Sequence, residues 1–247
     1  MEILILHPGG LGDILLSLPA IALLRKGYPS ARLTIAGNID HLAAVGRGYA
    51  DHIISLSTLP LHYLHAPGKV PEAEARFWRS FDHIVSWTGS GDPEFVRKLK
   101  QIRPSACVAA WRPGPHETRH VSRLFIESLG HEIDSGIETP QTEISLDPNA
   151  RDQGAQWLSG HGWNGRDRLM ALHPGAGSRL KRWPLSRFIE LARRLVLHEN
   201  TRLLIIEGPA DSGLAMQMAA ALAGMQAITV PLSEAVVRRM PVVSPIK

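Results

Sequence analysis

The feature that most constrains the fold of this chain is a pattern that occurs twice along it. An apolar run is followed by His-Pro-Gly, a glycine-rich turn and then a segment with helical spacing. The two copies are "LILHPGGLGD" (4–13) and "MALHPGAGSR" (170–179). A strand, a tight turn and a helix in this order form the repeating unit of parallel α/β sheets. The repetition therefore predicts two domains, each built around its own parallel sheet.

Strand-like and helix-like segments alternate through both halves of the chain, which predicts two Rossmann-like domains. The segments expected as strands are 2–7, 31–37, 50–57, 81–89, 105–111, 201–210 and 225–230, and 168–177 is expected as a strand that runs into a glycine-rich loop. Those expected as helices are 14–27, 38–48, 93–102, 151–163, 184–199 and 212–224. Residues 133–150 are rich in turn formers and acids and are expected to link the domains. The predicted domains are residues 1–135 and 150–247.

Composition narrows the functional class only moderately. The net charge is +4 and the basic residues are scattered, which predicts no nucleic-acid partner. The densest basic stretch outside the turns, "RKLKQIR" (97–103), is expected to be a solvated surface. Cys107 is the single cysteine, which excludes an intrachain disulfide and fits a reducing cytoplasm. The beginning "MEILIL" lacks the pattern of a signal peptide.

The first glycine-rich turn does not have a dinucleotide-binding pattern, because Leu15 stands where G-x-G-x-x-G requires a third glycine. Gly10 and Gly12 instead present backbone N–H groups at the beginning of a helix, where they suit a phosphate or carboxyl group. Asp13 is either the N-cap of that helix or a general base. The residues alone leave these two interpretations of Asp13 open.

The second glycine-rich turn is followed at once by cations, among them Lys181, just before a helix that begins near Pro184. Such a turn at a helix N-terminus predicts an anion site. After the next strand, Glu207 or Asp211 is placed to bond a ribose hydroxyl or to cap the following helix. The strand-ending histidines, His7 and His173, have no third ligand at metal spacing, so no metal is predicted.

Long stretches of the sequence resemble glycosyltransferase family nine, the ADP-heptose:lipopolysaccharide heptosyltransferases and their relatives. The first stretch is "ILILHPGGLGDILLSLPAIALLRKGYPSARLTIAG" (3–37), with its Leu-Gly-Asp turn. The others are "LHPGAGSRLKRWPLSRFIELARRL" (172–195) and "LLIIEGPAD" (203–211). The motifs occur in the order that is typical of the family and cover most of the chain.

The resemblance implies a GT-B fold of two Rossmann-like domains with the active site in the cleft. It also implies inverting transfer of a heptose from ADP-heptose to the inner core of lipopolysaccharide, without a cofactor. Asp13 corresponds to the general base of the family, residues 1–135 correspond to its acceptor-binding domain, and residues 150–247 correspond to its nucleotide-sugar domain. The implied location is the cytoplasm, with peripheral contact at the cytoplasmic face of the inner membrane. The residues implied to hold the ADP phosphates are Gly175, Ala176, Gly177, Ser178 and Lys181.

The chain departs from the family pattern in its second domain. Family members continue to an Asp-Ser/Thr-Gly-x-x-His segment that holds the nucleotide sugar, whereas "ADSGLAM" (210–216) lacks the histidine. We therefore expect the second domain to be incomplete. Two alternatives follow: a nucleotide-sugar binding protein without activity, and an NAD-dependent oxidoreductase, against which the failed glycine fingerprint counts. Binding of ADP-heptose without turnover would favour the first, and a cofactor screen tests the second.

Overall fold

The computed structural model describes residues 1–45, 48–130, 144, 148–176, 178–199, 201–208, 213–225 and 227–231. The chain divides into two compact units, Met1–Leu146 (unit 1) and Asp147–Lys247 (unit 2). Each unit has its own parallel sheet, as the alternating pattern predicts. Most of the expected linker, 133–150, lies outside the described residues, and the described part from residue 148 already belongs to a helix.

Unit 1 contains a five-stranded sheet in the order β3-β2-β1-β4-β5, and every neighbouring pair is parallel. Its strands are β1 (Glu2–Leu6), β2 (Arg32–Gly37), β3 (His52–Ser55), β4 (His83–Ser86) and β5 (Cys107–Val108). Its helices are α1 (Leu11–Gly27), α2 (Ile39–Val45), α3 (His62–His65), α4 (Glu72–Arg79), α5 (Pro93–Ile102) and α6 (Val121–Glu127), with a 3-10 turn at Leu56–Thr58.

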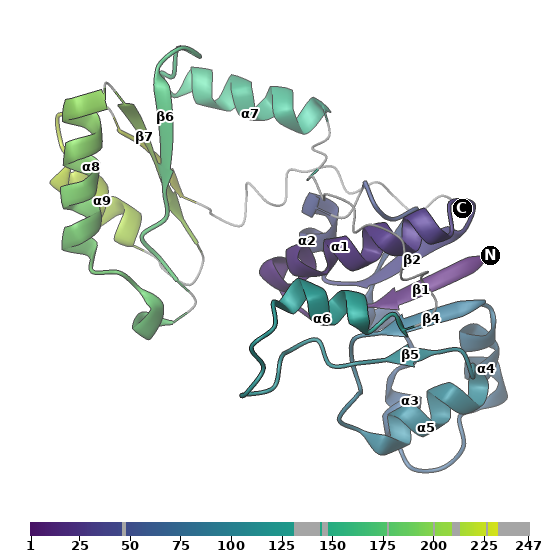
Figure 1. The fold of residues 1–247 in the computed structure, drawn as a ribbon. Coiled ribbons are helices and arrows are strands. Elements are labelled where there is room, and N and C mark those ends of the chain that lie inside the picture. Colours follow the sequence, from purple (N-terminus) through teal and green to yellow (C-terminus); the bar gives the residue numbers. More distant parts are fainter. Residues whose placement is uncertain are drawn as a thin grey trace. The chain divides into compact units, whose positions relative to one another are not determined.

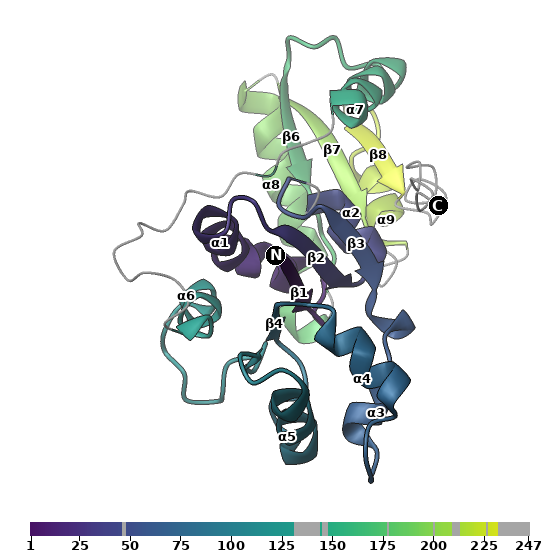
Figure 2. The same cartoon turned by 90° about the vertical axis from the view of Figure 1, so that its right-hand side faces the viewer.

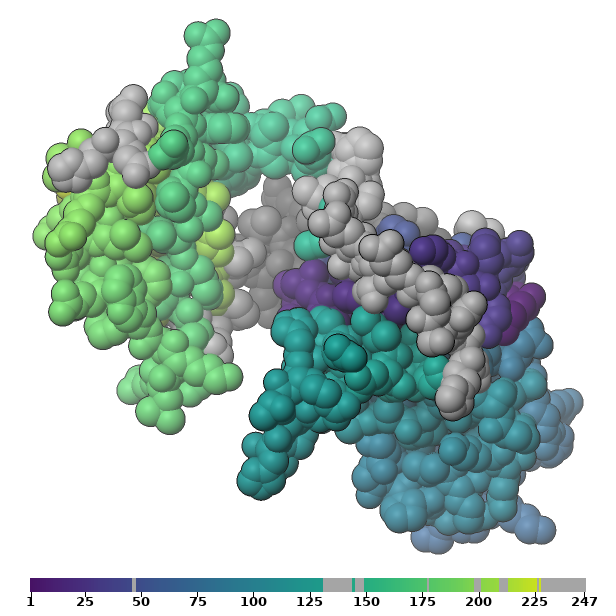
Figure 3. Space-filling model, in the orientation of Figure 1, coloured from purple at the N-terminus to yellow at the C-terminus, as the bar shows by residue number. Residues whose placement is uncertain are grey.

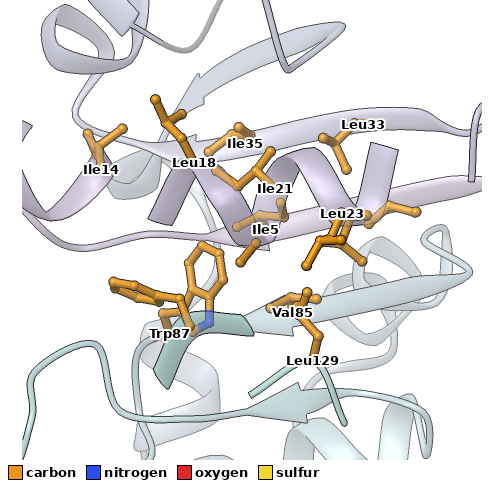
Figure 4. Packing of buried hydrophobic residues seen from close by; sticks show 14 of the residues in the cluster. Ile5, Ile14, Leu18, Ile21, Leu23, Leu33, Ile35, Val85, Trp87 and Leu129 are labelled. Carbon is orange, nitrogen blue, oxygen red and sulfur yellow. The ribbon is translucent and has the colours of Figure 1, made fainter. Parts of the chain in front are cut away.

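Helices cover both faces of this sheet (Figure 1, Figure 2). Alternate residues of β1 enter two separate cores: Ile3 and Ile5 contact α1, α2 and α6, and Leu4 and Leu6 contact α3, α4 and α5. Figure 4 shows the first core, where Trp87 and Val85 lie under α1. β1 is therefore buried on both sides, and its carboxyl end is held in place.

The first helix begins earlier than the sequence predicts. α1 starts at Leu11 instead of residue 14, and its N-cap is Gly10. The interpretation of Asp13 as the N-cap is therefore wrong, because Asp13 is the third residue of the helix. Pro19 lies inside the helix. Asn38, just before α2, caps that helix, since its Oδ1 accepts a hydrogen bond from the His41 N–H at 3.1 Å.

Unit 2 contains a three-stranded parallel sheet in the order β6-β7-β8. α8 and α9 contact each other and β7, and their apolar residues surround the buried Leu203 and Ile205. The elements are α7 (Pro148–Gly160), β6 (Arg168–Leu172), a 3-10 turn η3 (Arg179–Lys181), α8 (Leu185–Glu199), β7 (Thr201–Glu207), α9 (Leu214–Ala221) and β8 (Ala227–Pro231).

The basic stretch 97–103 is not uniformly a solvated surface. Arg97 is exposed and pairs with Glu94 at 2.5 Å, as expected of a surface residue. Lys98, in contrast, is only 3% exposed. Its ammonium group donates hydrogen bonds to the Tyr63 carbonyl at 3.1 Å and to the Ala66 carbonyl, at the C-terminal end of α3. A cation there satisfies carbonyls that the helix itself leaves unpaired.

Candidate functional site

The loop between β1 and α1 lies at the point where the strand order of unit 1 reverses. β1 pairs with β2 on one side and with β4 on the other, and the connections leave in opposite directions. Ligands of open α/β sheets bind outside the carboxyl ends of the strands at such a point. The predicted site residues Gly10, Gly12 and Asp13 are all placed on this loop and the first turn of α1.

The Asp13 carboxylate is fixed from one side. Its Oδ2 accepts a hydrogen bond from the Gly10 N–H at 2.9 Å, which closes the first turn of α1. The side chain is half-buried, and Oδ1 has no hydrogen bond to any described residue. Gly12 is exposed, and Gly10 is half-buried. The arrangement orients one carboxylate oxygen and leaves the second available to accept a proton.

His7 lies beneath this carboxylate. It is 0% exposed, its Nδ1 accepts a hydrogen bond from the Gly9 N–H at 3.1 Å, and its ring is 5.4 Å from that of Trp87. Burial lowers the pKa of His7 to about 4, although the nearby Asp13 acts in the opposite direction. His7 is therefore uncharged at neutral pH. It supports the loop as a packed neutral ring.

Gly9 separates His7 from Asp13, and any larger residue there would force one of these side chains to shift. A Cβ at this position would lie 2.5 Å from the Asp13 Cβ and 2.8 Å from the His7 Cε1. At Gly10 the nearest atom would be the Asp13 Oδ2 at 3.8 Å, an ordinary contact. The glycine at position 9 is required for packing the catalytic candidate against the strand end.

The loop after β6 carries the predicted anion site of unit 2. Gly175, Ala176 and Ser178 are half-buried, and the Ser178 Oγ caps the 3-10 turn by accepting a hydrogen bond from the Leu180 N–H at 3.4 Å. Lys181 is exposed and pairs with no described residue. Residues 178–183 project from unit 2 in the space-filling view (Figure 3). Gly177 lies outside the described residues.

Trp183 packs against α8. Its ring meets Phe188 edge-on at 5.0 Å, although the side chain remains 48% exposed. His173 is exposed, with its Nδ1 3.0 Å from the Ile206 carbonyl. Both His7 and His173 follow the end of a strand. His7 is buried, whereas His173 is exposed.

Glu207 ends β7, where the sequence predicts either a ribose contact or a helix cap. Its Oε2 accepts a hydrogen bond from the Ala215 N–H at 2.9 Å, in the first turn of α9. This bond confirms the helix-capping role and engages one carboxylate oxygen. The alternative candidate, Asp211, lies outside the described residues.

A pocket of about 400 Å³ opens beside the β1–α1 loop in unit 1. No motif marks this pocket in the sequence, because its wall is assembled from residues that follow three different strands. The only local signal is that several of them end a predicted strand. The lining residues are His7, Pro8, Gly37, Asn38, Ser55, Leu56, Ser57 and Leu61.

The described part of the chain holds neither a metal-binding cluster nor a membrane-spanning helix. Within it, no group of three or more His, Cys, Asp or Glu side chains is arranged to hold a metal ion. None of the helices it contains has the length and apolar character needed to cross a membrane.

Comparison with known proteins identifies the fold. No protein-family model and no curated protein matches the sequence. Among solved structures, a family 9 glycosyltransferase from Veillonella parvula superposes with a TM-score of 0.67 at 19% identity, covering 92% of this chain and 68% of that one. E. coli ADP-heptose lps heptosyltransferase II gives 0.62 at 15% identity, covering 96% and 76%. E. coli heptosyltransferase WaaC, solved with ADP, gives 0.57 at 16% identity, covering 96% and 77%.

These matches define the class of architecture. The chain is an α/β protein with parallel sheets and has the GT-B fold found in family 9 glycosyltransferases. The parallel α/β architecture predicted from the repeated strand and turn pattern, and the GT-B fold implied by the resemblance, are confirmed.

Proposed function

We propose that this chain is an inverting glycosyltransferase that transfers a heptose from ADP-heptose to the inner core of lipopolysaccharide. The observation that carries the proposal is the Asp13 carboxylate at the carboxyl end of β1, in a GT-B fold. One of its oxygens is held by the Gly10 N–H, and the other has no partner among the described residues. The heptosyltransferase structures with the same fold support the choice of donor.

In the proposed reaction, an acceptor hydroxyl attacks the anomeric carbon of the heptose from the face opposite the diphosphate. The new C–O bond forms while the bond to the diphosphate breaks, and ADP leaves with the electron pair. Asp13 takes the proton of the attacking hydroxyl. General base catalysis of this kind contributes about 10²–10⁴ to a rate.

Unit 2 supplies the ADP-binding loop in this proposal. The backbone around Gly175 and Ala176, the Ser178 hydroxyl and the exposed Lys181 ammonium group neutralise the departing diphosphate, which removes the need for a metal. Gly177 belongs to the same proposed loop. Glu207 has one oxygen engaged by α9, and its other oxygen is assigned to the ribose, as is Asp211.

Calorimetric titration with ADP and ADP-heptose, followed by an assay for ADP release in the presence of inner-core acceptor, tests the proposal. We expect both nucleotides to bind and acceptor-dependent ADP release to occur. Binding without turnover would favour the non-catalytic binding protein. Absence of ADP binding would contradict both functions.

A further inference from the structure

Two successive backbone N–H groups of the β1–α1 loop donate to two different side chains. The Gly9 N–H donates to the His7 Nδ1 at 3.1 Å, and the Gly10 N–H donates to the Asp13 Oδ2 at 2.9 Å. Each bond fixes the orientation of one planar peptide group, and the two planes meet at the Gly9 Cα. His7 therefore holds the peptide next to the one that is bonded to Asp13.

The His7 ring and the Asp13 side chain also pack on the same glycine. A Cβ built on Gly9 would lie 2.8 Å from the His7 Cε1 and 2.5 Å from the Asp13 Cβ. The ring in turn is held by two aromatic neighbours, Trp87 at 5.4 Å and Phe125 at 5.8 Å between ring centroids. The buried core of unit 1 thus sets the position of the ring, and the ring sets the position of the loop.

Histidine is an unfavourable residue for simply filling this space. Because Nδ1 accepts a hydrogen bond, the proton of the neutral ring is on Nε2. Nε2 is buried and has no hydrogen-bond partner in the described part of the chain. Burying an unpaired N–H costs free energy, and leucine would fill a similar volume without that cost. The feature of His7 that leucine lacks is the acceptor atom Nδ1.

The second His-Pro-Gly sequence uses its histidine in the opposite way. The His173 Nδ1 lies 3.0 Å from the Ile206 carbonyl oxygen, which can only accept, so this Nδ1 donates. The position that corresponds to Asp13 is occupied by Arg179 in this copy of the pattern. An accepting Nδ1 and a carboxylate therefore occur together, on the first loop.

We propose that His7 is a positioning residue for Asp13. By accepting the Gly9 N–H, its Nδ1 fixes the following peptide, whose N–H holds the Asp13 carboxylate in the orientation for proton transfer. The inference rests on the proposed transferase function. Without the acceptor, the carboxylate is oriented correctly in fewer molecules, so the chemical step slows while substrate binding is retained.

Two substitutions separate positioning from packing. His7→Asn keeps an acceptor oxygen near the place of Nδ1 and loses ring volume, whereas His7→Leu keeps apolar volume and loses the acceptor. Steady-state transfer from ADP-heptose to inner-core acceptor gives kcat and KM for both. We expect kcat to fall at least about tenfold in His7→Leu and to stay within about threefold of the wild type in His7→Asn, with KM unchanged. A packing role alone predicts the reverse order, because leucine suits an apolar core better than asparagine.

Amide hydrogen exchange, followed by NMR on the same proteins, measures the loop independently of transfer. The Gly9 and Gly10 amides should exchange at least about tenfold faster in His7→Leu than in the wild type, and His7→Asn should restore their protection. Leu129→Ala is the control for lost stability, because it opens a cavity in the same core and leaves the acceptor of the Gly9 N–H in place. Its kcat should equal that of the wild type.

Three results would overturn the inference: a wild-type kcat in His7→Leu, a kcat in His7→Asn as low as that in His7→Leu, or unchanged amide exchange in His7→Leu. Absence of transfer by the wild-type protein would instead contradict the proposed function. The exchange rates of Gly9 and Gly10 would then still decide whether His7 holds the loop.

Discussion

The two loops that share the sequence His-Pro-Gly have become different structures. In unit 1, α1 begins at Leu11 directly after the turn, and His7 is buried beneath Asp13. In unit 2, a 3-10 turn intervenes, α8 begins only at Leu185, and His173 is exposed. The same His-Pro-Gly motif is therefore followed by a fixed carboxylate, Asp13, in unit 1 and by an exposed basic turn, Arg179–Lys181, in unit 2.

The largest expected difference between the loops concerns their histidines. His7→Ala removes a buried ring and the acceptor of the Gly9 N–H, so we expect a loss of about 3 kcal/mol in the free energy of unfolding. His173→Ala removes an exposed ring and should cost about 1 kcal/mol or less. Urea denaturation measures both values. Equal losses would show that the two loops are equally packed.

The pH dependence of stability sharpens the same contrast. The native pKa of His7, about 4, lies below the value of an unfolded histidine, about 6.5, so the unfolded state binds the proton first. The stabilising effect of neutral His7 is complete above pH 6.5. It is lost as the pH falls toward 4, by up to about 3 kcal/mol.

Denaturation between pH 4 and 8 checks this expectation. The free energy of unfolding should change less steeply with pH in His7→Asn than in the wild type over this range. In His173→Asn the pH dependence should stay as in the wild type. Some slope remains in His7→Asn because burial also lowers the pKa of His83. A wild-type slope in His7→Asn would contradict the assignment.

The packing of the first loop can be tested at its glycines. Gly9→Ala places a Cβ 2.5 Å from the Asp13 Cβ, and the required shift should cost about 2 kcal/mol of stability. Gly10→Ala is the control, because its Cβ would meet nothing closer than 3.8 Å. Thermal denaturation of both variants measures the difference. A Gly9→Ala protein as stable as Gly10→Ala would show that the loop yields easily.

The smallest expected effect lies in the second loop. Lys181→Ala removes one exposed cation from the proposed diphosphate site, so ADP should bind about tenfold more weakly. Arg187→Ala removes a cation that is already paired with Glu190 on α8, and it should leave the affinity unchanged. Isothermal calorimetry provides both values. Equal weakening by the two substitutions would indicate a diffuse charge effect and no specific site.

The sequence predicts the strands and most of the long helices because their apolar periodicity is strong. The sequence does not predict the beginning of α1, because the Gly-Gly-Leu-Gly stretch is a poor helix former. The hydrogen bonds from the Ile14 N–H to the Gly10 carbonyl and from the Gly10 N–H to the Asp13 carboxylate define the earlier start. The burial of Lys98 could not be foreseen either, since its carbonyl partners belong to α3, about thirty residues away.

The candidate site divides in the same way. Asp13 and the loop 175–178 lie in local patterns that the sequence displays. The pocket formed by Asn38, Ser55 and Ser57 depends on the register of β2 and β3, which places Gly37 opposite Ser55. Such a pocket is a property of the assembled sheet, and local patterns do not contain it.

The central claim is that the first loop supplies the base, and the rate of transfer by Asp13→Asn tests it most directly. The amide oxygen of asparagine can still accept the Gly10 N–H, so fold and ADP affinity should be retained. We expect transfer from ADP-heptose to inner-core acceptor to fall at least about a hundredfold, with Asp40→Asn at the wild-type rate. A wild-type rate in Asp13→Asn would contradict the account.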